Sequence, residues 1–142
     1  MKVFERWRES TRTTQGFFIE EAAATWDVLL DFQEATGITG MLGGIGVWYA
    51  KSASLLAMHT RNEERLALVD QSIQPEARAL LEPFTPAGNV SYLEMRSSRL
   101  AGSAETARWP RAFRWIHVDG EHTGQALAND LHLCNLWLRR IM

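Results

Sequence analysis

The sequence contains a single cysteine, Cys134, which excludes an internal disulfide and a metal site built from several cysteines. It has no apolar run near the roughly 18 residues that a membrane-spanning helix needs. Residues 1–12 are polar and lack the apolar centre of a secretory signal peptide. These absences favour a cytoplasmic protein without a membrane partner.

The sequence also lacks an excess of charge of either sign. Its net charge of −2 offers no general attraction to nucleic acid or to anionic lipid, so we expect no nucleic-acid partner. The 46% apolar and 23% charged residues are typical of a folded globular protein rather than a disordered chain. We expect a single domain over residues 1–142, with residues 1–15 as a polar N-terminal extension.

Hydrophobic patterning predicts strands that alternate with helices along the chain. The expected strands are residues 41–47, 65–70 and 89–95, and residues 113–120 are expected to form a fourth strand and its terminal turn. The expected helices are residues 19–35, 52–59, 76–82 and a last one from Thr123 onward, with a loop or short helix at 101–110. Such alternation implies right-handed crossovers. The expected fold class is therefore α/β, with three layers (α/β/α) around a mainly parallel sheet of about four strands.

The apolar residues of the last expected helix recur at spacings of four and three residues. They are Leu127, Leu131, Cys134, Leu138 and Ile141. This spacing predicts that they form the stripe of the helix that faces the core. The chain ends at Met142, within this helix, so that the sheet would keep one open flank.

Residues suited to ligand binding stand at the ends of two expected strands. Gly44 and Gly46 mark the turn into which the first strand opens, and Asp70 ends the second strand. Glycine lets a backbone approach a ligand closely, and a carboxylate at a strand end can accept hydrogen bonds from ribose hydroxyls. Tyr49 replaces the third glycine of the dinucleotide fingerprint, which argues against nicotinamide or flavin. The alternatives are glycines that serve only packing and an Asp70 that caps the next segment.

A second cluster of polar residues lies at the end of the fourth expected strand. His117 and Asp119 share one face of this strand, and His122 follows in the turn before the last helix. A divalent metal held partly by Asp119 would lower the pKa of a substrate hydroxyl. His122 would instead take that proton as a general base. The alternatives are a core position for His117 and a solvent-facing or capping role for His122.

Three motifs resemble those of a known family. Residues 45–56 are similar to the first motif of class I S-adenosylmethionine-dependent methyltransferases, most closely the small-molecule O-methyltransferase-like group called methyltransferase family 24. Residues 66–70 resemble the second motif of these enzymes, and residues 115–123 resemble their fourth-strand motif. The resemblance covers residues 16–138 and implies a Rossmann-like fold.

Two residues depart from the pattern of this family. Gly44 stands where the family usually has an acidic residue that helps hold the methionine end of the cofactor. Ala50 stands where the family has its second glycine, and adds a methyl group where backbone and cofactor approach closely. If this position needs a positive φ, Ala50 also adds strain of about 1 kcal/mol.

The resemblance implies S-adenosylmethionine as cofactor and a hydroxyl group of a small molecule as methyl acceptor. Asp70 would accept hydrogen bonds from the ribose, and Ser97 or Ser98 would bond a ring nitrogen of adenine. Asp119 and His122 would be catalytic, with Asp119 as the ligand of a divalent metal such as Mg²⁺ if one is used. The implied cofactor-binding residues are Gly44, Gly46, Tyr49, Ser52, Asp70, Ser97, Ser98 and Asp119.

Full-length members of the family continue with a proline-glycine-glycine turn, a fifth strand and an antiparallel hairpin. We therefore expect a domain that is truncated before the fifth strand and incomplete at its C-terminal side. The alternative function is a catalytically inactive module that binds a nucleotide or another chain. Its exposed fourth-strand flank would then pair with that chain, for example in a homo-oligomer.

Overall fold

The computed structural model describes residues 2–85 and 88–140 of the chain. Four strands form one sheet in which every neighbouring pair is parallel. They are β1 (Met41–Ile45), β2 (Leu66–Asp70), β3 (Val90–Glu94) and β4 (Phe113–Val118), in the spatial order β3–β2–β1–β4. These are the four strands expected from the sequence, with slightly shorter bounds.

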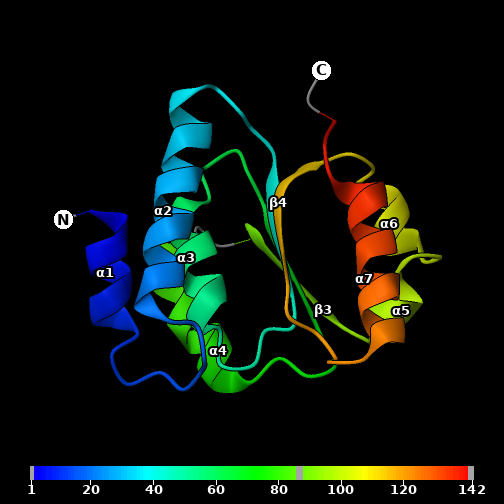
Figure 1. Cartoon of the computed structure of the whole chain (residues 1–142), viewed down its shortest axis with the longest axis horizontal. Coiled ribbons are helices and arrows are strands. Elements are labelled where there is room, and N and C mark those ends of the chain that lie inside the picture. Colours follow the sequence, from blue (N-terminus) through cyan, green and yellow to red (C-terminus); the bar gives the residue numbers. More distant parts are fainter. Residues whose placement is uncertain (1, 86–87, 141–142) are drawn as a thin grey trace.

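Helices cover both faces of the sheet (Figure 1). One face carries α2 (Glu20–Ala35), α3 (Lys51–His59) and α4 (Pro75–Leu81), which the short 3-10 helix η1 (Glu82–Phe84) follows. The other face carries α5 (Ser97–Leu100), α6 (Ala104–Arg108) and α7 (Gly124–Trp137). The expected three-layer, Rossmann-like α/β/α fold is therefore confirmed. Within the described residues, no helix combines the length and the apolar character that a membrane crossing requires.

The two central strands are buried on both faces. Leu42 and Leu68 point into a core beneath α3, whereas Ile45 and Val69 point into a second core beneath α7. A strand that is covered on both faces is apolar at nearly every position, which explains the continuous apolar runs of the sequence. Asp70, at the carboxyl end of β2, is the exception and is only half-buried.

The N-terminal residues belong to the packed domain rather than to an extension. Residues Val3–Ser10 form helix α1, which packs against α2 and α3. Trp7 is 1% exposed, and its Nε1 donates a hydrogen bond to the carbonyl oxygen of Lys51 at 2.8 Å. The rings of Phe4 and Phe18 pack against the Trp7 ring. The expectation of a polar extension over residues 1–15 is thus corrected, because one aromatic side chain anchors an otherwise polar helix.

The core-facing side of α7 differs from the expected stripe. Cys134 is buried as expected, but Leu127 and Leu131 are 49% and 56% exposed. The rings of Trp137 and Phe113 stack with their centroids 4.5 Å apart, and this contact sets the rotation of the helix against the sheet. The apolar spacing of the sequence therefore mispredicted which side of α7 faces the core.

Strand β4 forms an edge of the sheet. At its start, the backbone N–H of Arg139 donates to the carbonyl oxygen of Phe113 at 2.8 Å, and Leu138 makes a single parallel bridge to Phe113. No other described strand pairs with the outer side of β4. In Figure 1, β4 runs between α2 and α7, which expose Phe32 and Leu131. Pairing of this edge with a second copy of the chain stays a prediction.

A buried ion network joins the amino ends of the strands. The Glu64 carboxylate accepts hydrogen bonds from Arg114 Nε at 3.1 Å, Arg114 Nη2 at 3.0 Å and Arg61 Nη2 at 2.6 Å. It also accepts a hydrogen bond from the backbone N–H of Gly40 at 3.3 Å. Burial opposes ionisation of Glu64, but the hydrogen bonds from Arg114 and Arg61 outweigh it and lower the pKa of its carboxyl. The network thereby links the segments that precede β1 and β2 to β4.

We expect Glu64→Gln to lower the free energy of unfolding by about 3 kcal/mol, because it leaves the Arg114 guanidinium buried without a charged partner. Urea unfolding measures this loss, and the exposed Glu63→Gln is the matched control. The lowered pKa of Glu64 means that its contribution is complete above the ordinary value of 4.5 and is lost as the pH falls through the folded pKa. We therefore expect the stability of Glu64→Gln to change less with falling pH than the stability of the native chain. Equal stabilities of the two variants would contradict the role of the network.

Candidate functional site

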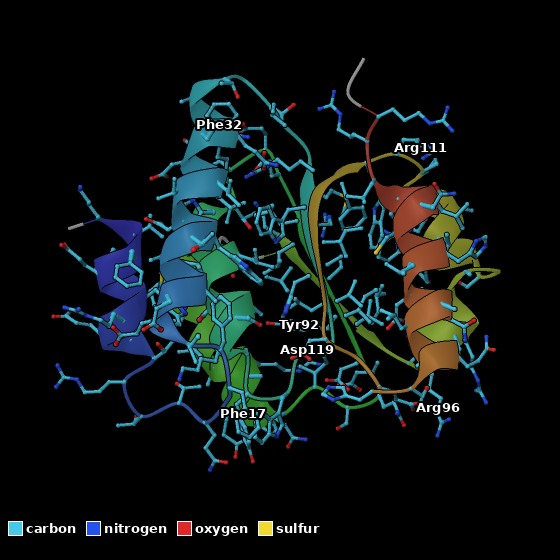
Figure 2. The ribbon with its side chains drawn as sticks, viewed as in Figure 1. Phe17, Phe32, Tyr92, Arg96, Arg111 and Asp119 are labelled. Atoms are coloured by element: carbon cyan, nitrogen blue, oxygen red, sulfur yellow. The ribbon has the colours of Figure 1, made fainter. Side chains whose placement is uncertain are left out.

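A cavity of about 390 Å³ lies at the carboxyl ends of the strands, beside the first turns of α5 and α7. Asp70 at the end of β2, Ser97 and Ser98 after β3, and Asp119 after β4 all line it. Figure 2 shows Asp119 and Arg96, another lining residue, at the end of the molecule where the strands terminate. Because the strands are parallel, their carboxyl ends bring these residues to one cavity.

Not every expected binding residue reaches the cavity. Gly46 lines it, whereas Gly44, Tyr49 and Ser52 do not. Gly44 lies inside β1, and a Cβ built on it would point toward Leu68, 3.2 Å from Cδ2, on the face that α3 covers. The structure thus brings together the strand-end residues but leaves three members of the expected set outside the lining.

Gly46 is required by the close approach of two strand ends. Its φ is +87°, and a Cβ built on it would lie 1.9 Å from the carbonyl oxygen of Asp119. The backbone N–H of Asp119 donates to the carbonyl oxygen of Ile45 at 2.7 Å. The glycine therefore lets the segment after β4 cross the end of β1, and this crossing places Asp119 at the cavity.

Asp70 holds the turn that follows β1. Its Oδ2 accepts hydrogen bonds from the backbone N–H groups of Val47 at 2.8 Å and Trp48 at 3.2 Å. Successive N–H groups that converge on one anion resemble the nests that bind phosphates in other proteins. Among the described residues, no donor bonds Oδ1 of Asp70, so this oxygen is available to a ligand. Asp70 therefore faces the glycine turn and not the helix that follows β2.

The same turn contains two non-glycine residues in the left-handed region. Trp48 has a φ of +49°, and Ala50, which is fully buried at the start of α3, has a φ of +66°. Position 50 therefore does need a positive φ, so Ala50 adds the expected strain. Such a conformation costs about 1 kcal/mol for each of the two residues. The two hydrogen bonds to Asp70 offset part of this strain.

Asp119 lines the cavity, whereas its loose partner His122 does not. Nε2 of His122 lies 3.5 Å from Oδ1 of Asp119, and the two side chains are 86% and 61% exposed. His117 packs edge-on against the ring of Trp26, with centroids 4.6 Å apart, and burial lowers the pKa of its imidazole although the Asp119 charge opposes this. These contacts support the alternative interpretation, in which His117 occupies a core position.

The donor atoms around Asp119 do not fit a metal ion. Within residues 2–85 and 88–140, no third carboxylate, histidine or cysteine joins Asp119 and His122 at metal-binding distances. Asp27, Asp31 and His59 do come together between α2 and α3. There Nε2 of His59 lies 2.8 Å from Oδ1 of Asp27, a hydrogen bond that ties the two helices together. Among the described residues, the cavity therefore offers no complete set of ligands for a metal ion.

The sequence did not reveal Asp130, which lies behind the cavity on α7. Its side chain is buried and accepts a hydrogen bond from Oγ of Ser97. A Cβ built on Gly120 would lie 2.9 Å from Oδ2 of Asp130, so this glycine leaves room for the carboxylate. The sequence did contain a signal for Asp130. This acidic residue lies on the same side of α7 as Leu133 and Cys134, which face the core, and a buried charge there needs a partner.

We expect Gly46→Ala to lower the free energy of unfolding by about 3 kcal/mol, because the added methyl group overlaps the Asp119 backbone and the φ is unfavourable. Gly102→Ala is the matched control, since a Cβ there has nothing within 4 Å. Thermal and urea unfolding of both variants measure the difference. A Gly46→Ala protein as stable as the control would contradict the geometry of the crossing.

No curated protein matches the chain. A family model described as a methyltransferase domain, that of methyltransferase family 24, matches residues 44–141. This stretch contains the glycine turn, Asp70, Asp119 and strands β2 to β4, which together build the cavity. The chain belongs to this methyltransferase family.

Proposed function

We propose that the chain binds S-adenosylmethionine in the cavity between Asp70 and Asp119 and transfers its methyl group to a hydroxyl group of a small molecule. Membership of the family implies S-adenosylmethionine as the cofactor. The observation that carries the proposal is the orientation of Asp70, which faces the turn with one oxygen and leaves the other available. A ribose diol supplies the donors that such an oxygen accepts.

The cavity has a size and a lining that suit a nucleoside. Its volume of about 390 Å³ falls in the range of small-molecule sites. Val69, Met95 and Ala126 supply apolar surface for a flat base. Asp70 at the end of β2 and Ser97 at the start of α5 supply polar atoms. A nucleoside would therefore place its sugar near β2 and its base toward α5 and α7.

The chain contributes positioning and proton transfer to the proposed reaction. The sulfonium centre of the cofactor supplies a methyl group for in-line displacement by an oxygen nucleophile. The protein would hold the two reactants in line, which lowers the barrier by several kcal/mol. His122, beside the lining residue Asp119, would accept the hydroxyl proton, and the carboxylate of Asp119 would orient and stabilise its imidazole.

A second candidate function is nucleotide binding without methyl transfer. It is favoured by the exposure of His122, whose contact with Asp119 is longer than a normal hydrogen bond. It is also favoured by Gly44, which lacks the carboxylate that the family usually carries at this position. Binding and turnover measurements separate the two candidates.

Isothermal titration calorimetry with S-adenosylhomocysteine tests the binding step. We expect Asp70→Asn to raise the Kd by about tenfold to about a hundredfold, because a charged acceptor for the ribose is lost. The amide oxygen of Asn can still accept from Val47 and Trp48, so the turn keeps a partner. The exposed Asp31→Asn is the matched control and leaves the Kd unchanged. No heat with the native chain, or equal Kd values for native chain and Asp70→Asn, would overturn the proposal.

Turnover tests the transfer step. The native chain is incubated with S-adenosylmethionine and a panel of small molecules that carry phenolic or alcoholic hydroxyl groups, and S-adenosylhomocysteine is quantified. We expect His122→Gln to lower kcat by about a hundredfold without changing the Kd of S-adenosylhomocysteine. His132→Gln, an exposed change on α7, is the control. Binding without turnover of any acceptor supports the second candidate, and an unchanged kcat in His122→Gln refutes the general-base role.

A further inference from the structure

We infer that Asp130 is a positioning residue that fixes the Ser97 hydroxyl as a hydrogen-bond acceptor, so that the cavity selects a nucleoside whose base carries an amino group. The inference rests on the proposed function, because it concerns the base end of the same cavity. It states that the Ser97 hydroxyl accepts, rather than donates, the hydrogen bond that it makes to the base.

The hydroxyl proton of Ser97 is committed to Asp130. Oγ of Ser97 lies within hydrogen-bond distance of Oδ1 of Asp130, whose side chain is 1% exposed. An ionised carboxylate accepts hydrogen bonds and has no proton to donate, so the hydroxyl must be the donor in this pair. Among the described residues, Ser97 is the one donor that bonds this carboxylate, and a buried carboxylate that lost it would be left without compensation.

The geometry around Asp130 keeps this pair in place. Asp130 lies on α7, Ser97 begins α5, and Gly120 follows β4, so three elements meet behind the cavity. A Cβ on Gly120 would lie 2.9 Å from Oδ2 of Asp130 and would push the carboxylate away. The absence of a side chain at Gly120 therefore allows Asp130 to reach Ser97.

A hydroxyl that donates to the protein can only accept from a ligand. Ser97 lines the cavity, so its oxygen lone pairs are available there. The expected bond from Ser97 to a ring nitrogen of adenine would require the proton that Asp130 already receives. An exocyclic amino group, such as the 6-amino group of adenine, offers the complementary donor. Hypoxanthine carries a carbonyl oxygen at this place, and two acceptors would then face one another without a proton between them.

The position of Ser97 relative to the sheet supports a contact between Ser97 and the base of the nucleoside rather than its sugar. Asp70 and Glu94 are paired residues at the ends of β2 and β3, and Ser97 follows three residues after Glu94. A sugar bound at Asp70 therefore has its base directed toward the neighbouring strand end, where Met95 and Ala126 provide apolar contact.

Calorimetric titration with S-adenosylhomocysteine and with S-inosylhomocysteine tests the inference. We expect the native chain to bind the adenosine compound at least about tenfold more tightly than the inosine compound. Asp130→Asn keeps the shape of the side chain, but its amide can donate to Ser97 and free the hydroxyl to donate to a carbonyl. Ser97→Ala removes the acceptor altogether. In both variants the preference should fall to about threefold or less, whereas Asp31→Asn keeps the native preference.

The outcomes separate this inference from the proposed function. If the native chain binds S-adenosylhomocysteine but shows no preference, or keeps its preference in both Asp130→Asn and Ser97→Ala, the inference is wrong and the proposed function stands. If the native chain binds neither compound, both are overturned. If Asp130→Asn fails to fold in a thermal unfolding measurement, the double variant Ser97→Ala/Asp130→Leu decides, because it removes the acceptor without leaving a buried carboxylate that has lost its donor.

Discussion

The cavity depends on one carboxylate oxygen that accepts two backbone hydrogen bonds. Oδ2 of Asp70 joins the end of β2 to the amides of Val47 and Trp48 in the turn after β1. The turn contains left-handed residues whose strain would favour other conformations, and the two charge-assisted bonds oppose that tendency. A turn that is held by an anion of the protein keeps its shape before any ligand arrives. The second oxygen of the same side chain is then available to the proposed ligand.

The two ends of the sheet carry different chemistry. At the amino ends, Glu64 receives hydrogen bonds from two arginines and from backbone, which leaves a closed and buried network. At the carboxyl ends, Asp70 and Asp119 keep carboxylate oxygens directed to a cavity. A network that fixes the strands at one end supports a site at the other, because binding residues need rigid elements beneath them. The location of the cavity follows from the parallel direction of all four strands.

The sequence predicted the strands, most helices and the strand-end residues of the site, because these follow from local periodicity and from the rule that parallel strands end together. It mispredicted the side of α7 that faces the core, because the stacking of Trp137 on Phe113 sets that rotation and joins residues far apart in the chain. It also missed Asp130, since its partner Ser97 lies on another element. The packing of Trp7 beneath a polar N-terminal sequence is a third case of this kind.

By itself, the sequence determined the order of the elements, the parallel sheet and the presence of Asp70 and Asp119 at its carboxyl end. Alternating apolar segments and glycine turns specify these features locally, whatever the rest of the chain does. Only the tertiary structure decided why Gly46 must be glycine, which oxygen of Asp70 is available and in which direction the Ser97 hydroxyl points. Each of these depends on a contact between residues more than 20 positions apart, and such contacts exist only once the helices have packed on the sheet.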